Sequence, residues 1–445
     1  MTTFSHTPSA PNPGSESVST PEKSPNANAN LIPTRILIIS DTHGNEFPLP
    51  TSTDKPIDLV IHCGDITRGS RIAHLHAAIA ALARIPTPLK LVIAGNHDFT
   101  LDTPVFRARL AELRAERAAD PSLVPATPSL LDKYGDVGDA RRVFESAAAR
   151  AAGVRFLDEG VYDFVLARTG ARLKVYASPY TPAFGTPGFQ YTEEEGHDFA
   201  IPRGVDVVVS HGPPKGVLDR VPMNGARAGS AELFAAVARA RPRLHCFGHI
   251  HEAWGAELVT WRDQDGDGDG DGEEGRGRRR GRGGGVVVDS LEEAIKRRKR
   301  EREPSHLVDI DQERSVLVDS LEALRVWDDT DEALEASEEK LRRLDQYITD
   351  KCCMTSHCAG DANPLIQEKH TLFVNAAAQK KIGRAPWIVD IELPRAEVEG
   401  ERCNGCNGHG NGHGNGNNGS SHENGHGSSE DNSHDNAHSN GSSRD

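Results

Sequence analysis

The sequence contains no run of about 20 apolar residues, although the chain is 445 residues long. A transmembrane helix needs such a run to cross the hydrocarbon layer, so we expect no membrane-spanning segment and no membrane partner. The first 20 residues, MTTFSHTPSAPNPGSESVST, also lack the apolar core of a signal peptide. These two absences favour a cytoplasmic location, with the nucleus as the alternative.

An excess of positive charge is also missing. The chain has 51 Lys and Arg against 66 Asp and Glu, for a formal net charge of −15. This balance disfavours binding of the whole chain to nucleic acid or acidic membranes. The exception is a set of basic runs within Arg276–Arg302, which could bind nucleic acid, although the acidic run beside them favours a solvated, self-neutralising segment.

Cysteine is scarce and odd in number, with seven residues in all. Two lie in apolar, strand-like runs and the others in polar segments, which does not fit a disulfide framework. We therefore expect free thiols in a reducing compartment. The pair Cys403-x-x-Cys406 lies among Asn and Gly residues, which offer no scaffold for a zinc ion.

Apolar residues make up only 36% of the chain, too few for the two or three domains that its length allows. We predict one globular domain, formed by residues 34–261 and 369–398. Residues 1–33 and the Asn/Gly/His/Ser-rich tail 399–445 are predicted to be disordered. Residues 262–368 are predicted to be a low-complexity and charged, helix-prone insertion. Within it, Asp263–Glu274 fits a calcium-loop pattern, but a strand precedes it and an Arg/Gly run follows, so an acidic linker is favoured.

Short, nearly continuous apolar runs recur along the predicted domain, as in strands buried on both faces. The five clearest runs are 35–40, 57–62, 89–94, 205–210 and 243–247. The Ala- and Leu-rich segment 70–85 predicts a helix between the second and third strands, and 106–119 and 140–152 also look helical. Residues 161–166, 173–177 and 256–261 alternate as antiparallel strands do, and strand-like sequence returns at 371–375 and 387–393. The pattern predicts a mixed α/β sandwich.

Each of the five buried runs is followed by a cluster of Asp, His or Asn side chains. These clusters are DTH from Asp41, GD at Asp65, GNHD from Gly95, SHG around His211 and GHIH ending at His251. Functional sites in α/β sheets form at the carboxyl ends of strands, so we expect the side chains to meet at one rim of the sheet. Glycines beside them would allow close backbone approach.

Carboxylates, an amide oxygen and neutral imidazoles are ligands for Mn, Fe or Zn. Their number exceeds what one ion needs, which predicts two divalent ions that share a bridging carboxylate. Such pairs clamp the attacking and leaving oxygens of a displacement at phosphorus.

In this order, the five motifs resemble the signature of calcineurin-like metallophosphoesterases. The stretches VYASPYTPAFG, SHGPPKGVLD, FVNAA and PWIVDIELP are similar to the metallophosphoesterase-domain group related to class III cyclic-nucleotide phosphodiesterases. The resemblance covers roughly residues 34–261 and 370–394. It implies a four-layer α/β/β/α sandwich with mixed sheets.

The resemblance also implies roles for individual residues. Asp41, His43, Asp65 and His251 would hold the first ion, Asp65 would bridge, and Asn96, His211 and His249 would complete the second site. A metal-bridging hydroxide would attack phosphorus in line. His97 would protonate the leaving oxygen, with Asp98 orienting it. Asn375 resembles a position near the site.

Two departures from the family pattern matter. Asp98 stands where many relatives carry Glu. The motif GDxVDRG of Ser/Thr protein phosphatases is absent; the chain reads GDITRGS, in which Arg68 either touches the phosphate or is a solvated charge.

The predicted function is hydrolysis of a small-molecule phosphodiester, with cyclic nucleotides as the leading candidates. The alternatives are a phosphomonoesterase acting on a small metabolite and a metal-binding scaffold protein with weak activity. Substrate choice is expected to depend on the loops 180–190 and 215–230.

Overall fold

The computed structural model describes residues 30–50, 55–120, 131–185, 188–221, 225–262, 309–320, 331–378 and 385–397. Several predictions concern residues outside these ranges. These residues are the polar segment up to residue 29, the Asp/Gly and Arg-rich runs between residues 263 and 308, and the tail with Cys403 and Cys406.

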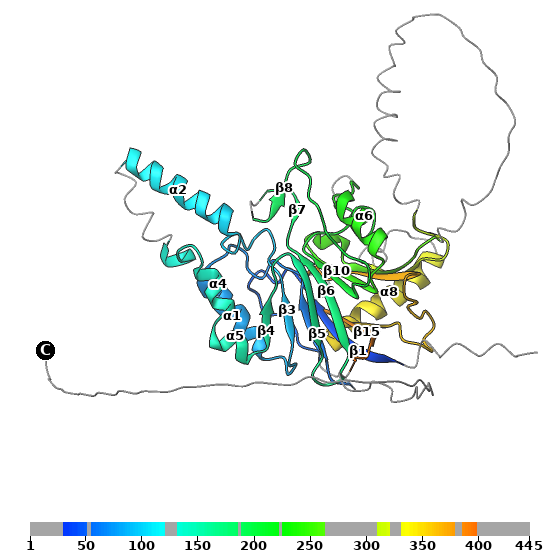
Figure 1. Cartoon of the computed structure of the whole chain (residues 1–445). Coiled ribbons are helices and arrows are strands. Elements are labelled where there is room, and N and C mark those ends of the chain that lie inside the picture. The colour runs from blue at the N-terminus through cyan, green and yellow to red at the C-terminus, as the bar shows by residue number, and fades with distance from the viewer. Residues whose placement is uncertain are drawn as a thin grey trace, which may run out of the picture. The chain divides into compact units, whose positions relative to one another are not determined.

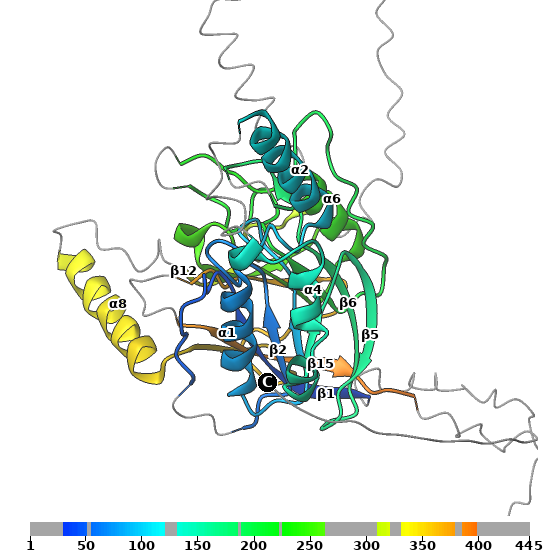
Figure 2. The same cartoon turned by 90° about the vertical axis from the view of Figure 1, so that its left-hand side faces the viewer.

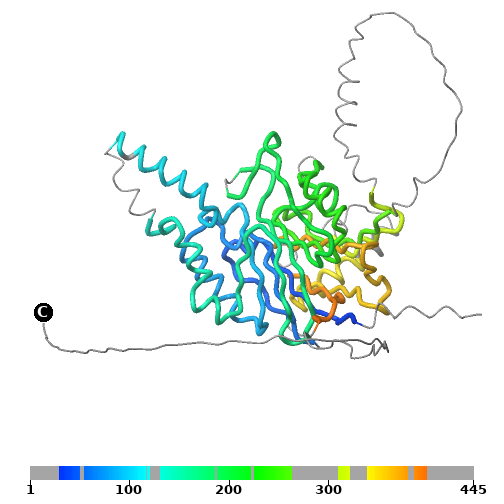
Figure 3. The backbone as a smooth tube through the Cα atoms, viewed as in Figure 1, coloured from blue at the N-terminus to red at the C-terminus, as the bar shows by residue number. Residues whose placement is uncertain are grey.

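The described strands form a six-stranded sheet, a seven-stranded sheet and a small two-stranded one. The six-stranded sheet has the order β13-β15-β1-β2-β3-β4. In chain order its strands are β1 (Leu31–Ile39), β2 (Leu59–His62), β3 (Lys90–Val92), β4 (Val154–Phe156), β13 (Cys353–Ser356) and β15 (Trp387–Pro394). β1 pairs in parallel with β2 and antiparallel with β15, so two strands more than 300 positions apart lie side by side, as the blue and orange segments of Figure 3 show.

The seven-stranded sheet has the order β12-β11-β14-β10-β9-β6-β5. Its strands are β5 (Gly160–Val165), β6 (Arg172–Ser178), β9 (Val207–Ser210), β10 (Leu244–Phe247), β11 (Gly255–Thr260), β12 (Val316–Ser320) and β14 (His370–Asn375). The small sheet consists of β7 (Thr181–Pro182) and β8 (Gln190–Tyr191). Parallel and antiparallel pairs occur together, as in β6 with β9 and β5 with β6, which confirms the predicted mixed sheets.

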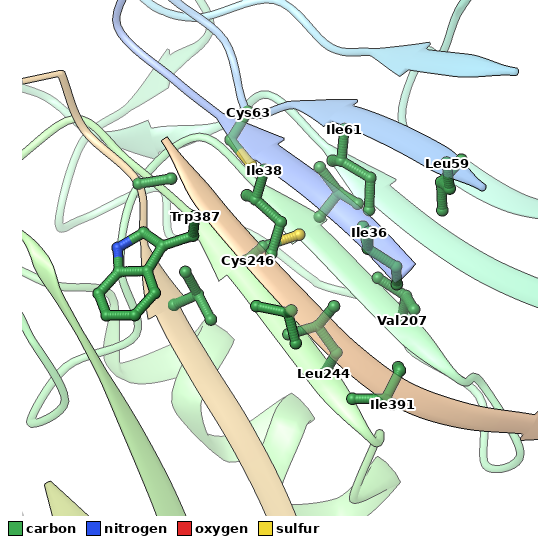
Figure 4. Close-up of a cluster of buried hydrophobic side chains, with 14 of the residues drawn as sticks. Ile36, Ile38, Leu59, Ile61, Cys63, Val207, Leu244, Cys246, Trp387 and Ile391 are labelled. Atoms are coloured by element: carbon green, nitrogen blue, oxygen red, sulfur yellow. The ribbon is translucent and has the colours of Figure 1, made fainter. Parts of the chain in front are cut away.

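Alternate residues of the continuous apolar runs face two different cores, because side chains alternate across a strand. In β1, Ile36 and Ile38 pack between the sheets, whereas Leu37 and Ile39 pack against helices. The core between the sheets takes residues from both, including Ile61, Val207 and Trp387, as Figure 4 shows.

Helices cover the outer face of each sheet. α1 (Ile72–Ala83), α4 (Asp139–Phe144) and α5 (Ala147–Ala151) lie on the six-stranded sheet, and α6 (Ala231–Ala240) lies on the seven-stranded one. Figure 1 shows these helices on opposite sides of the strands. The four layers confirm the predicted α/β/β/α sandwich.

Four features differ in detail from the prediction. The helix predicted over 140–152 is two helices, because Ser146 caps a new one at Ala147. α2 (Thr103–Ala119) begins earlier than predicted because Asp102 accepts a hydrogen bond from the Val105 amide. β1 starts at Leu31, inside the segment predicted to be disordered, because it pairs with Pro394.

The fourth difference concerns the range 262–368, which was predicted to be an insertion. Its described part contributes β12 and β13 to the two sheets, and neither strand was predicted from the sequence. The same range contains the helix α8 (Asp331–Asp350), which Figure 2 shows beside the sheets. Tyr347 on α8 donates a hydrogen bond of 2.5 Å to the buried Asp319 of β12.

The five described cysteines are free, in agreement with the prediction. Within the described ranges, no helix has both the length and the apolarity needed to cross a membrane.

Candidate metal centre

The predicted ligands follow strands of both large sheets. Asp41, Asp65 and Asn96 come after β1, β2 and β3 of the six-stranded sheet, whereas His211 and His249 come after β9 and β10 of the seven-stranded sheet. The expectation that they meet at the rim of one sheet is therefore corrected. The apolar runs are alike in both sheets, so the sequence does not tell them apart. Packing the sheets face to face brings the two sets of strand ends together.

The first group of ligands consists of Asp41, His43 and His251. The Nε2 atom of His251 lies 3.3 Å from Asp41 Oδ1 and 3.3 Å from His43 Nε2. This half of the site is partly open, since the side chains of His43 and His251 are 16% and 35% exposed. We call it the open half.

The second group contains Asn96 and His211, and we call it the buried half, because His211 is fully buried and Asn96 is 3% exposed. His211 Nε2 lies 3.0 Å from Asn96 Oδ1. His211 Nδ1 lies 2.9 Å from the carbonyl oxygen of Cys63. A carbonyl only accepts hydrogen bonds, so Nδ1 carries the proton and the lone pair of Nε2 points into the site.

Asp65 lies between the halves. Its Oδ2 atom is 3.7 Å from His43 Nε2, and its Oδ1 atom is 3.4 Å from His211 Nε2. Among the described residues, three groups have ligand atoms within 4.8 Å of one another: Asp41 with His43 and His251, His43 with Asp65 and His97, and Asp41 with Asp65 and His211. His249 belongs to none of these groups, but its ring centroid lies 5.0 Å from that of His211.

The backbone of the site is strained. Asp41, His43, Asp65 and His249 all have positive φ angles, of 54°, 49°, 51° and 69°. Non-glycine residues pay about 1–3 kcal/mol for such conformations, which cluster at functional sites. Four of the predicted ligands thus adopt a backbone that the rest of the fold must hold in place.

Two glycines of the motifs allow close contact at this point, as the sequence predicted. A Cβ atom on Gly248 would lie 2.1 Å from Asp41 Oδ2, and one on Gly95 would lie 2.3 Å from Asp65 Oδ1. Any larger residue would push a carboxylate out of position.

Burial and the neighbouring charges shift the pKa values of the imidazoles and carboxylates in the site. Burial lowers the pKa of His43 to about 4, and burial also lowers the pKa of His211, so both rings are neutral at pH 7. Burial, together with the charges of Asp41 and Asp98, raises the pKa of Asp65. Burial acts to raise the pKa of Asp41 as well, but the hydrogen bond from His251 and the nearby imidazoles bring it below its usual value.

These donor atoms fit metal ions. His211 Nε2, which carries no proton, lies 3.0 Å from the Asn96 amide oxygen and 3.4 Å from Asp65 Oδ1. The lone pair of His211 Nε2 thus meets the lone pairs of the Asn96 oxygen without a proton between them. A cation satisfies such an arrangement, and the mixture of oxygen and nitrogen suits Mn, Fe or Zn.

His97 lies at the open half, with its ring centroid 4.9 Å from that of His43. Its Nδ1 atom is 3.0 Å from the carbonyl oxygen of Arg68, and its Nε2 atom is 3.9 Å from Asp65 Oδ2. Arg68 thus contacts His97 through its backbone, a contact that sequence reasoning about its side chain did not anticipate.

Asp98 was predicted to orient His97, and its described hydrogen bonds go to other groups. The fully buried Asp98 carboxylate accepts four hydrogen bonds, from the amides of Ile66, Thr67 and Gly95 and from Thr67 Oγ1. All its partners flank Asp65 or Asn96, so Asp98 ties together the two loops that carry these ligands. Burial raises its pKa to about 6, against the effect of these hydrogen bonds, which lower it.

Asn375 supports the site from β14. It is fully buried, and its side-chain amide donates to the carbonyl oxygens of Leu218 and Ile250. Ile250 lies between His249 and His251, so Asn375 holds the turn that carries both histidines. Trp254, in contrast, is buried against Trp387, with ring centroids 4.9 Å apart, which is a packing role.

A cavity of about 850 Å³ opens over the site. Its floor includes His43, Asp65, His97 and His251. Its walls come from the segments 182–185 and 191–193, and from residues 215, 221 and 226–232. The loops on which substrate choice was predicted to depend therefore line the space beside the candidate metal centre.

Residues 34–253 match the family model of the calcineurin-like phosphoesterases. The chain is 32% identical to "Metallophosphoesterase domain-containing protein 1" of Homo sapiens over 228 residues, which is 50% of this chain and 62% of that protein. It is 30% identical to "UPF0046 protein T07D4.2" of Caenorhabditis elegans over 227 residues, which is 50% of this chain and 52% of that protein. The matches thus span between half and two thirds of these relatives. Through residues 34–253, the chain belongs to the calcineurin-like phosphoesterase family.

Proposed function

We propose that this chain is a two-metal phosphoesterase that hydrolyses phosphodiesters. The observation that carries the proposal is the convergence of ligand side chains from two sheets on Asp65, which lies within 3.7 Å of a histidine from each half. A single carboxylate facing two sets of ligands is the arrangement that paired ions use.

In this proposal, Asp41, His43 and His251 hold one ion, Asn96, His211 and His249 hold the other, and Asp65 bridges them. When bound, two divalent ions would lower the pKa of a water molecule and neutralise charge on the phosphoryl oxygens. The protein itself holds the ligand side chains in position. The hydrogen bond from His211 to Cys63 and the tie made by Asp98 fix the ligands before substrate arrives.

His97 is the proposed general acid. Its Nδ1–H donates to the Arg68 carbonyl, which leaves Nε2 free to face the cavity. An imidazole held in this way can deliver a proton from Nε2 to the leaving oxygen. General acid help of this kind contributes roughly 10²–10⁴-fold to a rate.

The preference for diesters, with cyclic nucleotides as leading candidates, rests on the motif resemblance and on the size of the cavity. At about 850 Å³ it can accept organic groups beside the phosphorus, since pockets for small organic ligands measure about 300–1,000 Å³. A phosphomonoesterase and a scaffold with weak activity are the competing functions.

The test is an activity panel with the full chain, loaded in turn with Mn, Fe and Zn. We expect bis-(p-nitrophenyl) phosphate to be cleaved faster than p-nitrophenyl phosphate, and at least one cyclic nucleotide to be hydrolysed. Faster cleavage of the monoester would establish the phosphomonoesterase. Absence of cleavage with every ion, in protein shown by elemental analysis to contain metal, would establish the scaffold.

A further inference from the structure

One aromatic side chain beside the candidate metal centre is conspicuously exposed. Phe184 is 81% exposed, more than any other large apolar side chain in the described ranges. Single exposed apolar residues need no explanation on a protein surface. Phe184, however, lines the same cavity as His43, Asp65 and His97. The next most exposed, Val165, is on the edge strand β5 and does not line this cavity.

The backbone around Phe184 is held in place. The Gln190 side chain donates a hydrogen bond of 3.0 Å to the Phe184 carbonyl, and the Ala183 amide donates one of 2.9 Å to the Tyr191 carbonyl. The stem of the loop is anchored further down, where the Phe189 amide donates to the buried Asp102 carboxylate at 2.8 Å. These bonds fix the backbone on both sides of the ring, so Phe184 is presented from an anchored segment.

The cavity has two chemically different sides. Its floor is made of the carboxylate and imidazole groups of the candidate metal centre. The apolar side chains near Phe184 in the cavity wall are Pro182, Ala183 and Tyr191, and Val221 and Ala226 come from the other loop. Charged side chains, among them Glu193, Lys215 and Arg227, also line the wall. A ligand that fills both sides carries a phosphoryl group at one end and an apolar group at the other.

We propose that Phe184 is the platform for a planar aromatic ring of the substrate's organic part. An exposed ring face gains most from a flat, polarisable partner, and stacking of a nucleobase on an aromatic side chain changes affinity by about 10-fold or more. The inference rests on the proposed function, because it takes the phosphoryl group to bind at the metal centre. It makes Phe184 a residue that determines specificity, with no role in the chemical step.

The test compares phosphonates, which the site can bind but cannot hydrolyse. Phenylphosphonate and 4-biphenylphosphonate carry rings of different reach, and ethylphosphonate carries none. Dissociation constants are measured by calorimetry with the full, metal-loaded chain. We expect at least one aryl phosphonate to bind about 10-fold more tightly than ethylphosphonate, and Phe184→Ala to abolish this difference. Phe184→Tyr should preserve it, whereas Phe184→Leu, which keeps apolar bulk without a ring face, should lose most of it.

Because Phe184 is exposed, its substitution should leave the melting temperature and the metal content unchanged. An aryl preference equal in all four proteins, or absent from the wild type, would overturn the inference. The readout does not depend on turnover. If the aryl preference depends on Phe184 but the activity panel fails, the platform stands and the proposed hydrolysis falls. If diesters are hydrolysed but Phe184→Ala binds every phosphonate as the wild type does, the platform falls and the hydrolysis stands.

Discussion

The two halves of the candidate metal centre have similar ligands but are held very differently. In the buried half, His211 is fully enclosed, and its Nδ1 atom is fixed by the Cys63 carbonyl. In the open half, His43 and His251 are partly exposed, and the buried His43 Nδ1 has no hydrogen-bond partner within the described ranges. Orienting bonds to ligand histidines are typically worth 10–100-fold in metal affinity. The buried half is therefore expected to hold its ion tightly, and the open half to meet solvent and substrate.

The largest effect is expected from removing the carboxylate that both halves share. Asp65→Asn should lose both ions and lower kcat by about 10³-fold or more, because paired ions supply several kcal/mol of transition-state stabilisation. Elemental analysis and steady-state kinetics measure the two effects. His76→Ala, at an exposed histidine of α1, is the matched control and should change neither. If Asp65→Asn retained two ions, Asp65 would not be the bridge.

The next largest effect is expected at the open half, where His97 lies beside His43. His97→Ala should keep both ions but slow the hydrolysis of esters with poor leaving groups by about 10²–10⁴-fold. Esters of p-nitrophenol, which leaves without a proton, should be much less affected. The ratio of kcat values for the two kinds of ester is the measurement. Loss of metal in this variant would make His97 a ligand and exclude it as the acid.

The third test concerns Asp98, whose carboxylate ties the loop of Asp65 to the loop of Asn96. Asp98→Asn replaces one carboxylate oxygen, which accepts two hydrogen bonds, by an NH2 group, which cannot accept any. Two buried donors would lose their partner, which should cost about 2–4 kcal/mol of the free energy of unfolding. Urea denaturation measures this cost, and Asp98→Glu, which keeps a carboxylate on a longer side chain, should recover part of it. If Asp98→Asn had the kinetics of His97→Ala and the stability of the wild type, Asp98 would be the residue that orients His97.

Much of this arrangement was predictable from the sequence, and the reason lies in local patterns. Runs such as Arg35–Ser40 are continuous because both faces of the strand are buried, and the polar cluster after each run marks where burial ends. The glycines at 95 and 248 signalled close contact because no other residue fits there. The features that could be predicted are those in which residues close in the sequence determine the surroundings of a side chain.

What could not be predicted depends on contacts between distant segments. β13 is four residues long, too short for a period to show, and is defined by pairing with β15. β12 lies in a charged stretch and is defined by pairing with β11. The division of five similar strands between two sheets, and the partners of Asp98, likewise depend on pairing and loop geometry. Phe184 is exposed because no other described segment covers its ring, and the local sequence pattern does not indicate which segments cover a side chain.

The smallest predicted effect is a difference in the free energy of unfolding between a variant of the buried half and a variant of the open half. In protein treated with a chelator, His211→Ala should lower the free energy of unfolding by about 1–3 kcal/mol more than His251→Ala does. His211 is fully buried, so its removal leaves a cavity and strands the Cys63 carbonyl without a donor. His251 is 35% exposed, and its contact with Asp41 is long at 3.3 Å, so water can replace much of what is lost. Urea denaturation in the chelator isolates these protein contacts from metal binding. Equal losses would mean that the protein orders both halves alike, and that any difference in metal affinity must come from the ions themselves.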